Sequence, residues 1–405
     1  MIEKVDHKSP TPRPQLVRSE SNRKLSAHSS WYRGDECHFG PQLSTMFLPD
    51  AIEKYILHGW TPEKPFISKD TKVVAFGSCF AREITQWLAK RKYNLLTSKE
   101  GPNKNIYAVE FGEGLVSTYT LLQQFEWSLE GKTFDTELWH GYDKEAHGYD
   151  ESIRARTEAM FQQADVFIIT LGLSEIWYDE VSGDVFWRAV PSDKFDPSRH
   201  KFRVATVSEN RQNIERMIEV IRKHRPDSKI IFSLSPIPLV ATFRANSCLT
   251  SNAASKASLR AAVDEIMRAE DSPKDVFYWP SYELVMDGFH ERWLEDRRHI
   301  KPEILHYMLT LFETYFCSDS EIKTGIAEMC LKARIAEGTM PVELIELMDT
   351  GDFDTLSEYL VALNEIEWEK FELAKAGMRQ AAERMGGKKG ADFNAMLDEL
   401  SSKQE

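Results

Sequence analysis

Four short apolar segments in the central part of the chain predict β-strands. They cover residues 73–76, 166–171, 229–234 and 276–279. Several of them lack the alternation of apolar and polar residues that a half-exposed strand shows, which is typical of strands covered on both faces. The pattern therefore favours a parallel sheet that is buried between two layers of other structure.

Helical periodicity fills the segments between these strands. Thr206 and Glu209 have the spacing of a capping box at the start of a helix. Alternation of strands and helices implies parallel pairing with right-handed crossovers. We therefore expect an α/β fold, a three-layer α/β/α sandwich with a mostly parallel sheet. The apolar residues with helical spacing are Ile214, Met217, Ile218 and Ile221 in one segment and Leu259, Ala262, Val263 and Ile266 in another.

The pattern changes at both ends of the chain. Residues 1–30 are polar and lack an apolar core, which predicts a disordered tail, and residues 31–318 hold the central domain. From residue 319 onward Glu, Lys, Ala and Met dominate, which predicts an all-helical C-terminal region over residues 319–405. Two roles are open for this region. It could bind a partner, either a second copy of the chain or another protein, or it could cap an edge of the sheet.

Composition argues against several classes of protein. Of the 405 residues, 42% are hydrophobic and 28% are charged, as in ordinary globular domains. The formal net charge of −13 argues against nucleic-acid binding, and no segment approaches the roughly 20 apolar residues of a membrane span. The five cysteines lack metal-type spacing, so we expect free thiols and no metal site. The polar N-terminus does not resemble a secretory signal, and these features together favour a cytoplasmic protein.

The candidate chemistry begins directly after the first strand. Gly77, Ser78 and Cys79 lie between this strand and an amphipathic helix. Glycine permits a tight turn, and the N–H groups at a helix N-terminus favour a negatively charged group. A thiol or hydroxyl placed there is a candidate nucleophile. A small buried turn would have the same sequence, so the segment alone leaves both interpretations open.

A second candidate lies just before a late apolar helix. Asp296 stands three residues before His299, so its carboxylate can accept from one ring nitrogen and leave the other free as a base. Two charged surface residues are the alternative interpretation. The order along the chain, with a nucleophile after the first strand and an Asp–His pair before a late helix, favours catalysis.

These two segments resemble the GSCFA-domain family of bacterial proteins, which is related to the SGNH (GDSL-type) esterases and acyltransferases. The family signature reads Gly77-Ser78-Cys79-Phe80-Ala81 in this chain. Similar stretches follow at residues 171–177, 235–239 and 279–283 and at the Asp296–His299 pair. The resemblance covers roughly residues 31–316 and implies an SGNH-hydrolase-like fold.

The resemblance also implies catalytic roles. In GDSL-type enzymes the nucleophile stands two residues after the turn glycine, and that position is Cys79, whereas the residue type of those enzymes is found at Ser78. A thiol at a helix N-terminus beside a histidine is the stronger nucleophile, so Cys79 is favoured over Ser78. His299 would then act as the base, and Asp296 would orient it.

The residues that contact substrate are harder to assign. Related esterases use an asparagine as an oxyanion donor, but the corresponding block here reads Gly172-Leu173-Ser174-Glu175. Ser174 and Asn105 are the substitute donors that we consider. For Glu175 a structural hydrogen-bond role remains open, and for Arg244 a surface role. The full set of oxyanion and substrate candidates is Gly77, Asn105, Gly172, Ser174, Glu175, Trp177 and Arg244.

We therefore expect an SGNH-like hydrolase or transferase, an esterase or acyltransferase acting on acyl esters or thioesters without a required cofactor. Acyl-CoA is the donor substrate that a cytoplasmic location would supply, and the resemblance implies a glycan or polysaccharide precursor as the molecule modified. The alternative is a non-catalytic glycan- or protein-binding scaffold that keeps the SGNH-like fold. The missing asparagine favours this scaffold, and the Asp296–His299 pair opposes it.

Overall fold

The computed structural model describes residues 38, 40–111, 114–134, 136–141, 147–269, 273–322, 325–340, 344, 355–357, 360–361, 363 and 368–402. Contacts group the chain into two units, Met1–Leu43 and Ser44–Glu405, and the second unit contains every helix and strand named below. The tail predicted at residues 1–30 lies outside the described residues. The domain boundary predicted at residue 318 stays a prediction.

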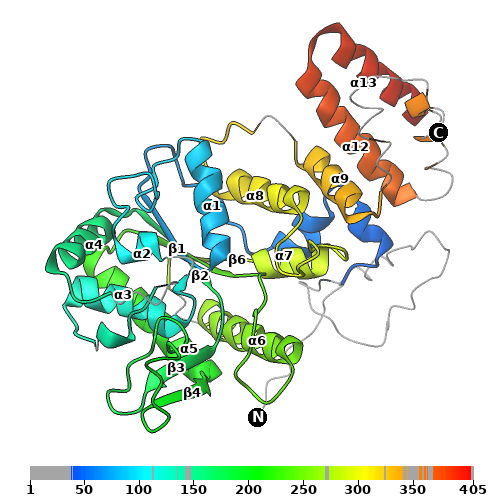
Figure 1. Cartoon of the computed structure of the whole chain (residues 1–405). Coiled ribbons are helices and arrows are strands. Elements are labelled where there is room, and N and C mark those ends of the chain that lie inside the picture. The colour runs from blue at the N-terminus through cyan, green and yellow to red at the C-terminus, as the bar shows by residue number, and fades with distance from the viewer. Residues whose placement is uncertain are drawn as a thin grey trace, which may run out of the picture. The chain divides into compact units, whose positions relative to one another are not determined.

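A four-stranded parallel sheet forms the centre of the larger unit (Figure 1). Nearly every residue of these strands is buried, which explains why the strands are apolar throughout. They are the strands expected from the apolar segments, so the α/β class and the parallel sheet are confirmed. The strands are β1 (Val73–Gly77), β2 (Val166–Leu171), β5 (Lys229–Leu234) and β6 (Val276–Trp279), in the order β1-β2-β5-β6.

Helices cover both faces of the sheet, so the domain has three layers. Alternate residues of β1 enter two different cores, with Val74 and Phe76 in the first and Val73 and Ala75 in the second. The first core is covered by α2 (Tyr107–Glu110), α3 (Thr118–Glu130), α4 (Glu151–Gln163), α5 (Val207–His224) and α6 (Cys248–Met267). The second core is covered by α1 (Cys79–Lys90), α7 (Ser281–Gly288) and α8 (Pro302–Phe316).

The segments that follow β1 in the sequence lie on both sides of it in the sheet. After α1 it returns to the outer edge of β1, where the Val73 N–H donates to Asn94 O at 2.9 Å and the Leu96 N–H donates to Val73 O at 2.8 Å. The next strand, β2, pairs with the opposite edge of β1. In open parallel sheets, such a switch point leaves a crevice at the carboxyl ends of the strands, and ligands bind there. The segments that follow β1 and β2 therefore meet at this crevice.

The sequence predicted the capping box of α5 but not a hairpin that follows β2. The predicted capping box is present at the start of α5, where the Glu209 N–H donates to Thr206 Oγ1 at 3.1 Å and the Thr206 N–H donates to Glu209 Oε2 at 2.8 Å. An antiparallel hairpin that follows β2 was not predicted. Its strands are β3 (Glu175–Asp179) and β4 (His200–Val204), and the short helical turns are η1 (Ser44–Phe47), η2 (Glu53–Leu57) and η4 (Thr136–Leu138).

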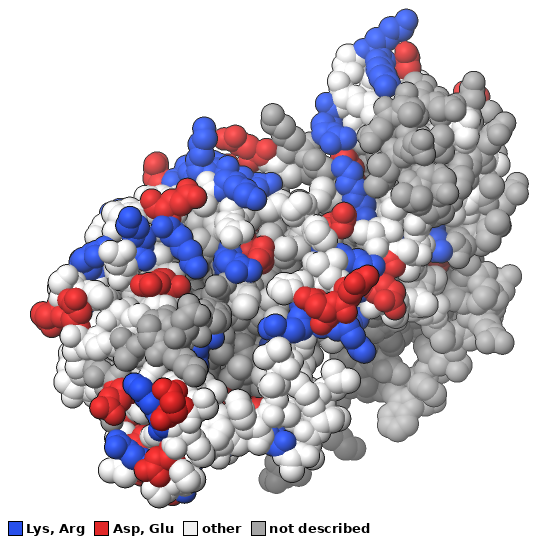
Figure 2. All heavy atoms as spheres, in the orientation of Figure 1, with Lys and Arg blue, Asp and Glu red and all other residues white. Residues whose placement is uncertain are grey.

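Helices follow the sheet domain, as the sequence predicts. They are α9 (Ile326–Glu337), α12 (Trp368–Met385) and α13 (Gly387–Ser402). These helices share a core of their own, and α9 also contacts α8. In the described part of the chain, no helix combines the length and the apolar character that crossing a membrane requires. On the face drawn in Figure 2, acidic and basic side chains are interspersed over the surface.

Candidate active site

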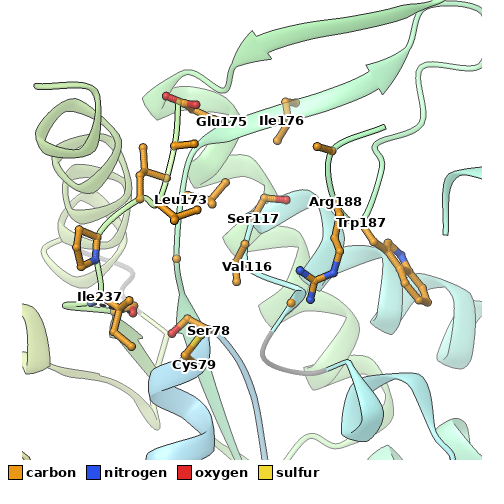
Figure 3. A pocket seen from close by; sticks show the side chains of 18 of the residues that line it. Ser78, Cys79, Val116, Ser117, Leu173, Glu175, Ile176, Trp187, Arg188 and Ile237 are labelled. Carbon is orange, nitrogen blue, oxygen red and sulfur yellow. Dashed lines mark hydrogen bonds between the residues drawn. The ribbon is translucent and has the colours of Figure 1, made fainter. Parts of the chain in front are cut away.

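A cavity of about 530 Å³ opens at the carboxyl ends of β1 and β2. Figure 3 shows Ser78 and Cys79 at its lower edge, with Leu173 and Ile237 on one side. His299, from the segment before α8, also lines the cavity. The cavity therefore brings together the two candidate segments, which are far apart in the sequence.

Gly77 and Ser78 shape the turn between β1 and α1. Gly77 has a φ of +135°, and a Cβ at this position would lie 2.2 Å from the Thr170 carbonyl oxygen of β2, so only glycine fits. The Ser78 N–H donates to the same oxygen at 3.1 Å. The Ser78 hydroxyl oxygen accepts the Phe80 N–H at 3.2 Å and so caps the helix. Ser78 thus has a structural role in addition to lining the cavity.

Cys79 is the first residue of α1. Its side chain is half-buried and lines the cavity. Among the described residues, no acceptor is found for its backbone N–H, which is the first N–H of the helix. A thiolate at this position would be stabilised by the N-terminal end of the helix dipole.

Asp296 and His299 form a pair within one short loop. The Asp296 carboxylate accepts the backbone N–H groups of His299 at 3.0 Å and of Arg298 at 2.9 Å, and its Oδ2 contacts Nδ1 of the His299 ring. These hydrogen bonds hold the pKa of Asp296 well below its usual range, and the bond from the His299 N–H has the largest effect. The carboxylate engages Nδ1, so Nε2 is the ring nitrogen that remains for chemistry in the cavity.

A buried lysine that the sequence analysis missed lies beside this site. Lys256 of α6 is 2% exposed, and its Nζ donates to the Gly172 carbonyl oxygen at 2.7 Å. Burial lowers the pKa of Lys256 to about 7, and the negative charge of a Cys79 thiolate acts in the opposite direction. The signal in the sequence is its position three residues before Leu259, on the buried stripe of α6.

Two of the expected oxyanion donors are already engaged. The Gly172 N–H donates to Val116 O at 2.8 Å. The Ser174 hydroxyl donates to Ser255 O at 3.1 Å, and the Ser174 N–H donates to Ser255 Oγ at 2.7 Å. Ser174 is fully buried and Asn105 is exposed, and neither lines the cavity. The structure therefore separates these two residues from Cys79.

Glu175 and Trp177 of β3 both line the cavity. The Glu175 carboxylate accepts the Thr242 hydroxyl at 2.6 Å and the Phe243 N–H at 3.4 Å, so it also holds the loop between β5 and α6. Trp177 meets the Phe243 ring edge-on, with ring centroids 5.2 Å apart. Arg244 follows in the same loop but does not line the cavity.

Three arginines that the sequence analysis did not single out line the cavity: Arg82, Arg188 and Arg298. In Figure 3 the Arg188 guanidinium extends into the cavity from the side opposite Ile237. A Cβ at Gly114 would lie 2.1 Å from the Arg188 guanidinium, so glycine makes room for it. Within the described residues, no cluster of three or more His, Cys, Asp or Glu side chains could hold a metal ion. The cavity is thus richer in cations than in anions.

Comparison with known proteins identifies the family of this chain. Residues 72–312, more than half of the chain, match the GSCFA family. The chain belongs to the GSCFA family. A comparison with curated proteins gives no match. The GSCFA match includes Cys79, Lys256 and His299 and ends within α8, so α9, α12 and α13 lie beyond it.

Proposed function

We propose that this GSCFA-family chain is an SGNH-like esterase or acyltransferase with Cys79 as its nucleophile, His299 as its base and Asp296 as the group that orients His299. One observation carries the proposal. Cys79 and His299 line one cavity at the switch point of the sheet, and His299 is held by Asp296. A nucleophile, a base and an orienting carboxylate are the three groups that acyl transfer through a covalent intermediate requires.

In the proposed reaction, the Cys79 thiol gives its proton to Nε2 of His299, and its sulfur bonds to the carbonyl carbon of an acyl ester or thioester. The tetrahedral intermediate expels the alcohol or thiol, which takes the proton from His299 and leaves an acyl-enzyme thioester. Water or a sugar hydroxyl then gives a proton to His299 and attacks the acyl carbon. The released Cys79 sulfur recovers the proton, and the product is an acid or a new ester.

The geometry supports Cys79 over Ser78 as the nucleophile. The Ser78 hydroxyl oxygen caps α1 by accepting the Phe80 N–H, so deprotonation and acylation of this hydroxyl would disrupt the helix start. The Cys79 side chain has no such role among the described contacts. This division of roles explains why the sequence carries both residues.

Stabilisation of the oxyanion would come from two donors. The first is the Cys79 backbone N–H at the start of α1. The second is the Arg188 guanidinium, which carries several N–H groups and extends into the cavity. Arg188 would replace the asparagine of related esterases, because the Gly172 N–H and the Ser174 hydroxyl are engaged elsewhere.

The lining also supports a substrate class. Arginine side chains favour phosphate and carboxylate groups, which suits acyl-CoA as the donor. Aromatic side chains at the cavity, such as Trp177 and Phe243, suit the apolar face of a sugar ring in a glycan or polysaccharide precursor. A cytoplasmic location, where acyl-CoA is available, is part of this proposal. A second copy of the chain or another protein bound to the C-terminal helices also remains a proposal.

One observation favours the alternative of a non-catalytic glycan- or protein-binding domain. The N–H of Gly172 and the hydroxyl of Ser174 are occupied by Val116 and Ser255. Losing one oxyanion donor typically lowers kcat about 10²- to 10³-fold. A binding domain would tolerate this loss, whereas an efficient hydrolase requires a replacement donor such as Arg188.

Three variants test the proposed function. The protein is incubated with an acyl-CoA, and thiol release and the intact mass of the protein are followed. Wild type is expected to release thiol and to gain one acyl group. Cys79→Ala should lose the acyl adduct and reduce thiol release to background. His299→Ala should slow acylation by roughly 10²- to 10⁴-fold, the usual contribution of a general base.

Ser78→Ala is the matched control for Cys79→Ala. It removes a helix cap, which typically costs about 1 kcal/mol of stability, but it should keep the acyl adduct. Equal thiol release by the two alanine variants, or an adduct that survives in Cys79→Ala and disappears in Ser78→Ala, contradicts the assignment of Cys79. Glycan binding without any thiol release by wild type supports the binding domain.

A further inference from the structure

Lys256 is buried in a way that lysines seldom are. A buried ammonium group usually has a carboxylate partner, because removing the charge from water is costly. Lys256 is 2% exposed, and the one hydrogen bond found for it among the described residues goes to the Gly172 carbonyl oxygen. Two acidic side chains on neighbouring elements are engaged by other groups, Glu175 by Thr242 and Glu283 by Arg260.

The titratable group that acts on Lys256 is Cys79. Among the described residues, Cys79 is the side chain whose negative charge raises the pKa of Lys256 against the effect of burial. The topology explains this proximity. Gly172 directly follows β2, Cys79 directly follows β1, and the two strands are neighbours, with Gly77 paired to Thr170. The lysine therefore reaches from α6 across the end of β2, toward the start of α1.

We infer that Lys256 is a positioning residue whose buried ammonium stabilises the thiolate form of Cys79. The inference rests on the proposed function, in which this thiolate attacks the acyl carbon. A cation stabilises a neighbouring anion more strongly in a water-poor interior than in water. The Gly172 carbonyl oxygen holds the ammonium in place by accepting one of its N–H groups. The N-terminus of α1 acts on the thiolate in the same direction.

The charge of Lys256 would respond to the state of Cys79. Burial lowers the pKa of Lys256 to about 7, so near neutral pH both the amine and the ammonium are present. Formation of a thiolate at Cys79 favours the ammonium, and neutralisation of the sulfur by acylation removes this stabilisation. Lys256 exchanges this proton with water, and the thiol proton goes to His299 in the proposed reaction.

The test measures the thiol of Cys79 directly. Alkylation of Cys79 by iodoacetamide is followed by peptide mass spectrometry between about pH 5 and pH 9, and the thiolate is the reacting form. Lys256→Met removes the charge and keeps a similar length. We expect the pH midpoint of alkylation to rise by about one unit, which lowers the rate about tenfold at pH values well below both midpoints. Lys256→Arg, which keeps a positive charge, should recover part of the rate.

A purely structural role for Lys256 predicts the opposite changes in the melting temperature and the pH midpoint. If Lys256 only ties α6 to the Gly172 carbonyl, Lys256→Met should lower the melting temperature and leave the pH midpoint unchanged. We expect the reverse. The melting temperature should stay the same or rise, because a buried charge without a carboxylate partner is replaced by an apolar group. An unchanged midpoint overturns the inference, whatever happens to the melting temperature.

Two controls separate charge from rearrangement. In the first, Lys69→Met removes an ammonium that also donates to a backbone carbonyl, that of Arg91, outside the cavity lining. It should leave alkylation of Cys79 unchanged. In the second, the half-buried Cys248 at the start of α6 is an internal reference. A parallel rate change at Cys248 in Lys256→Met would mean that α6 has moved, and it overturns the inference.

Failure of the inference about Lys256 can be distinguished from failure of the proposed function. Alkylation requires no acyl substrate, so a protein without acyl transfer can still show the shift in midpoint. In that case the proposed function fails and the effect of Lys256 on Cys79 stands. If wild-type Cys79 is not alkylated at any pH while Cys248 is, the inference is overturned.

Discussion

Asp296 acts within its own loop, and its effect on His299 can be tested at the scale of single residues. Its carboxylate engages Nδ1 of His299 and two backbone N–H groups, and this keeps it ionised to acidic pH. Asp296→Asn should let the ring rotate and lose the correct tautomer, and we expect the rate of acyl transfer to fall roughly 10²- to 10⁴-fold, as when general-base catalysis is lost. The measurement is kcat with an acyl-CoA substrate, beside KM, which should change little.

The matched control is Glu295→Gln, which neutralises an exposed carboxylate one residue away. It changes the charge of the loop by the same amount but leaves the Asp296–His299 contact in place. Equal losses of kcat in the two variants would mean that only the net charge of the loop matters for the reaction. The pair at Asp296 would then be a surface interaction.

At the residue scale, contacts between residues close in the sequence could be predicted, whereas contacts between residues far apart could not. The spacing of Asp296 and His299 predicts their contact, because three residues of chain bring the side chains together. The approach of Lys256 to Cys79 depends instead on how α6 packs across the end of β2, which no local pattern records. Similarly, the Gly172 N–H is occupied by Val116, from a segment far away in sequence.

The same contrast holds for whole elements. Strands of the parallel sheet are buried on both faces, so each leaves an uninterrupted apolar segment that can be recognised. Strand β4 is partly exposed along its whole length and contains His200, Lys201 and Arg203, so it carries no such signal. Its pairing with β3 is specified by tertiary contacts, and the hairpin that carries Glu175 and Trp177 into the cavity was therefore missed.

An ion pair between the buried Asp179 and the partly exposed Arg199 closes this hairpin and makes its stability depend on pH. Asp179, at the end of β3, accepts from Arg199 and from the Ser182 N–H at 2.8 Å. Burial alone would raise the pKa of Asp179, but the hydrogen bonds from Arg199 and Ser182 outweigh it and lower the pKa to about 2. In the unfolded chain, the pKa of an aspartate is about 3.9. The stabilisation is therefore complete above pH 4 or so and is lost as the pH falls toward 2.

Asp179→Asn should remove this stabilisation. We expect a loss of about 2 kcal/mol at neutral pH, the range for hydrogen bonds to a charged group. In urea unfolding at several pH values, the difference from wild type should shrink below about pH 4. Glu180→Gln is the control, because Glu180 forms an exposed ion pair with Lys201 at 3.6 Å and such pairs contribute little. A difference for Asp179→Asn that stays constant down to pH 3 would contradict the assignment.

At the scale of the whole molecule, a helix outside the GSCFA match holds the loop that carries His299. The His290 N–H, before the loop, donates to the Glu337 carboxylate, and Lys301 Nζ, after the loop, donates to Ala336 O at 2.9 Å. Both acceptors lie at the end of α9 or within its last turn. Helix α9 therefore has a role within the chain that does not require a partner.

These two hydrogen bonds to α9 predict an effect on catalysis from a residue that does not itself line the cavity. Lys301→Met removes one of the two anchors without leaving a buried charge unpaired. We expect little change in urea unfolding, but a lower kcat with KM nearly unchanged, because His299 would be held less well in its catalytic position. Glu303→Gln, an exposed change two residues further on in α8, should leave kcat unchanged.

Glu337→Ala removes the other anchor and also breaks a buried ion pair with Arg334, whose Nη1 lies 3.0 Å from the Glu337 carboxylate. Arg334 also donates to Gly288 O at 2.8 Å and to Met46 O at 2.9 Å, so it links α9 to α7 and η1. Removing one partner of such a pair costs roughly 3–5 kcal/mol, which urea unfolding would detect. If Glu337→Ala lost this stability while Lys301→Met kept wild-type kcat, the C-terminal helices would support the fold without positioning His299.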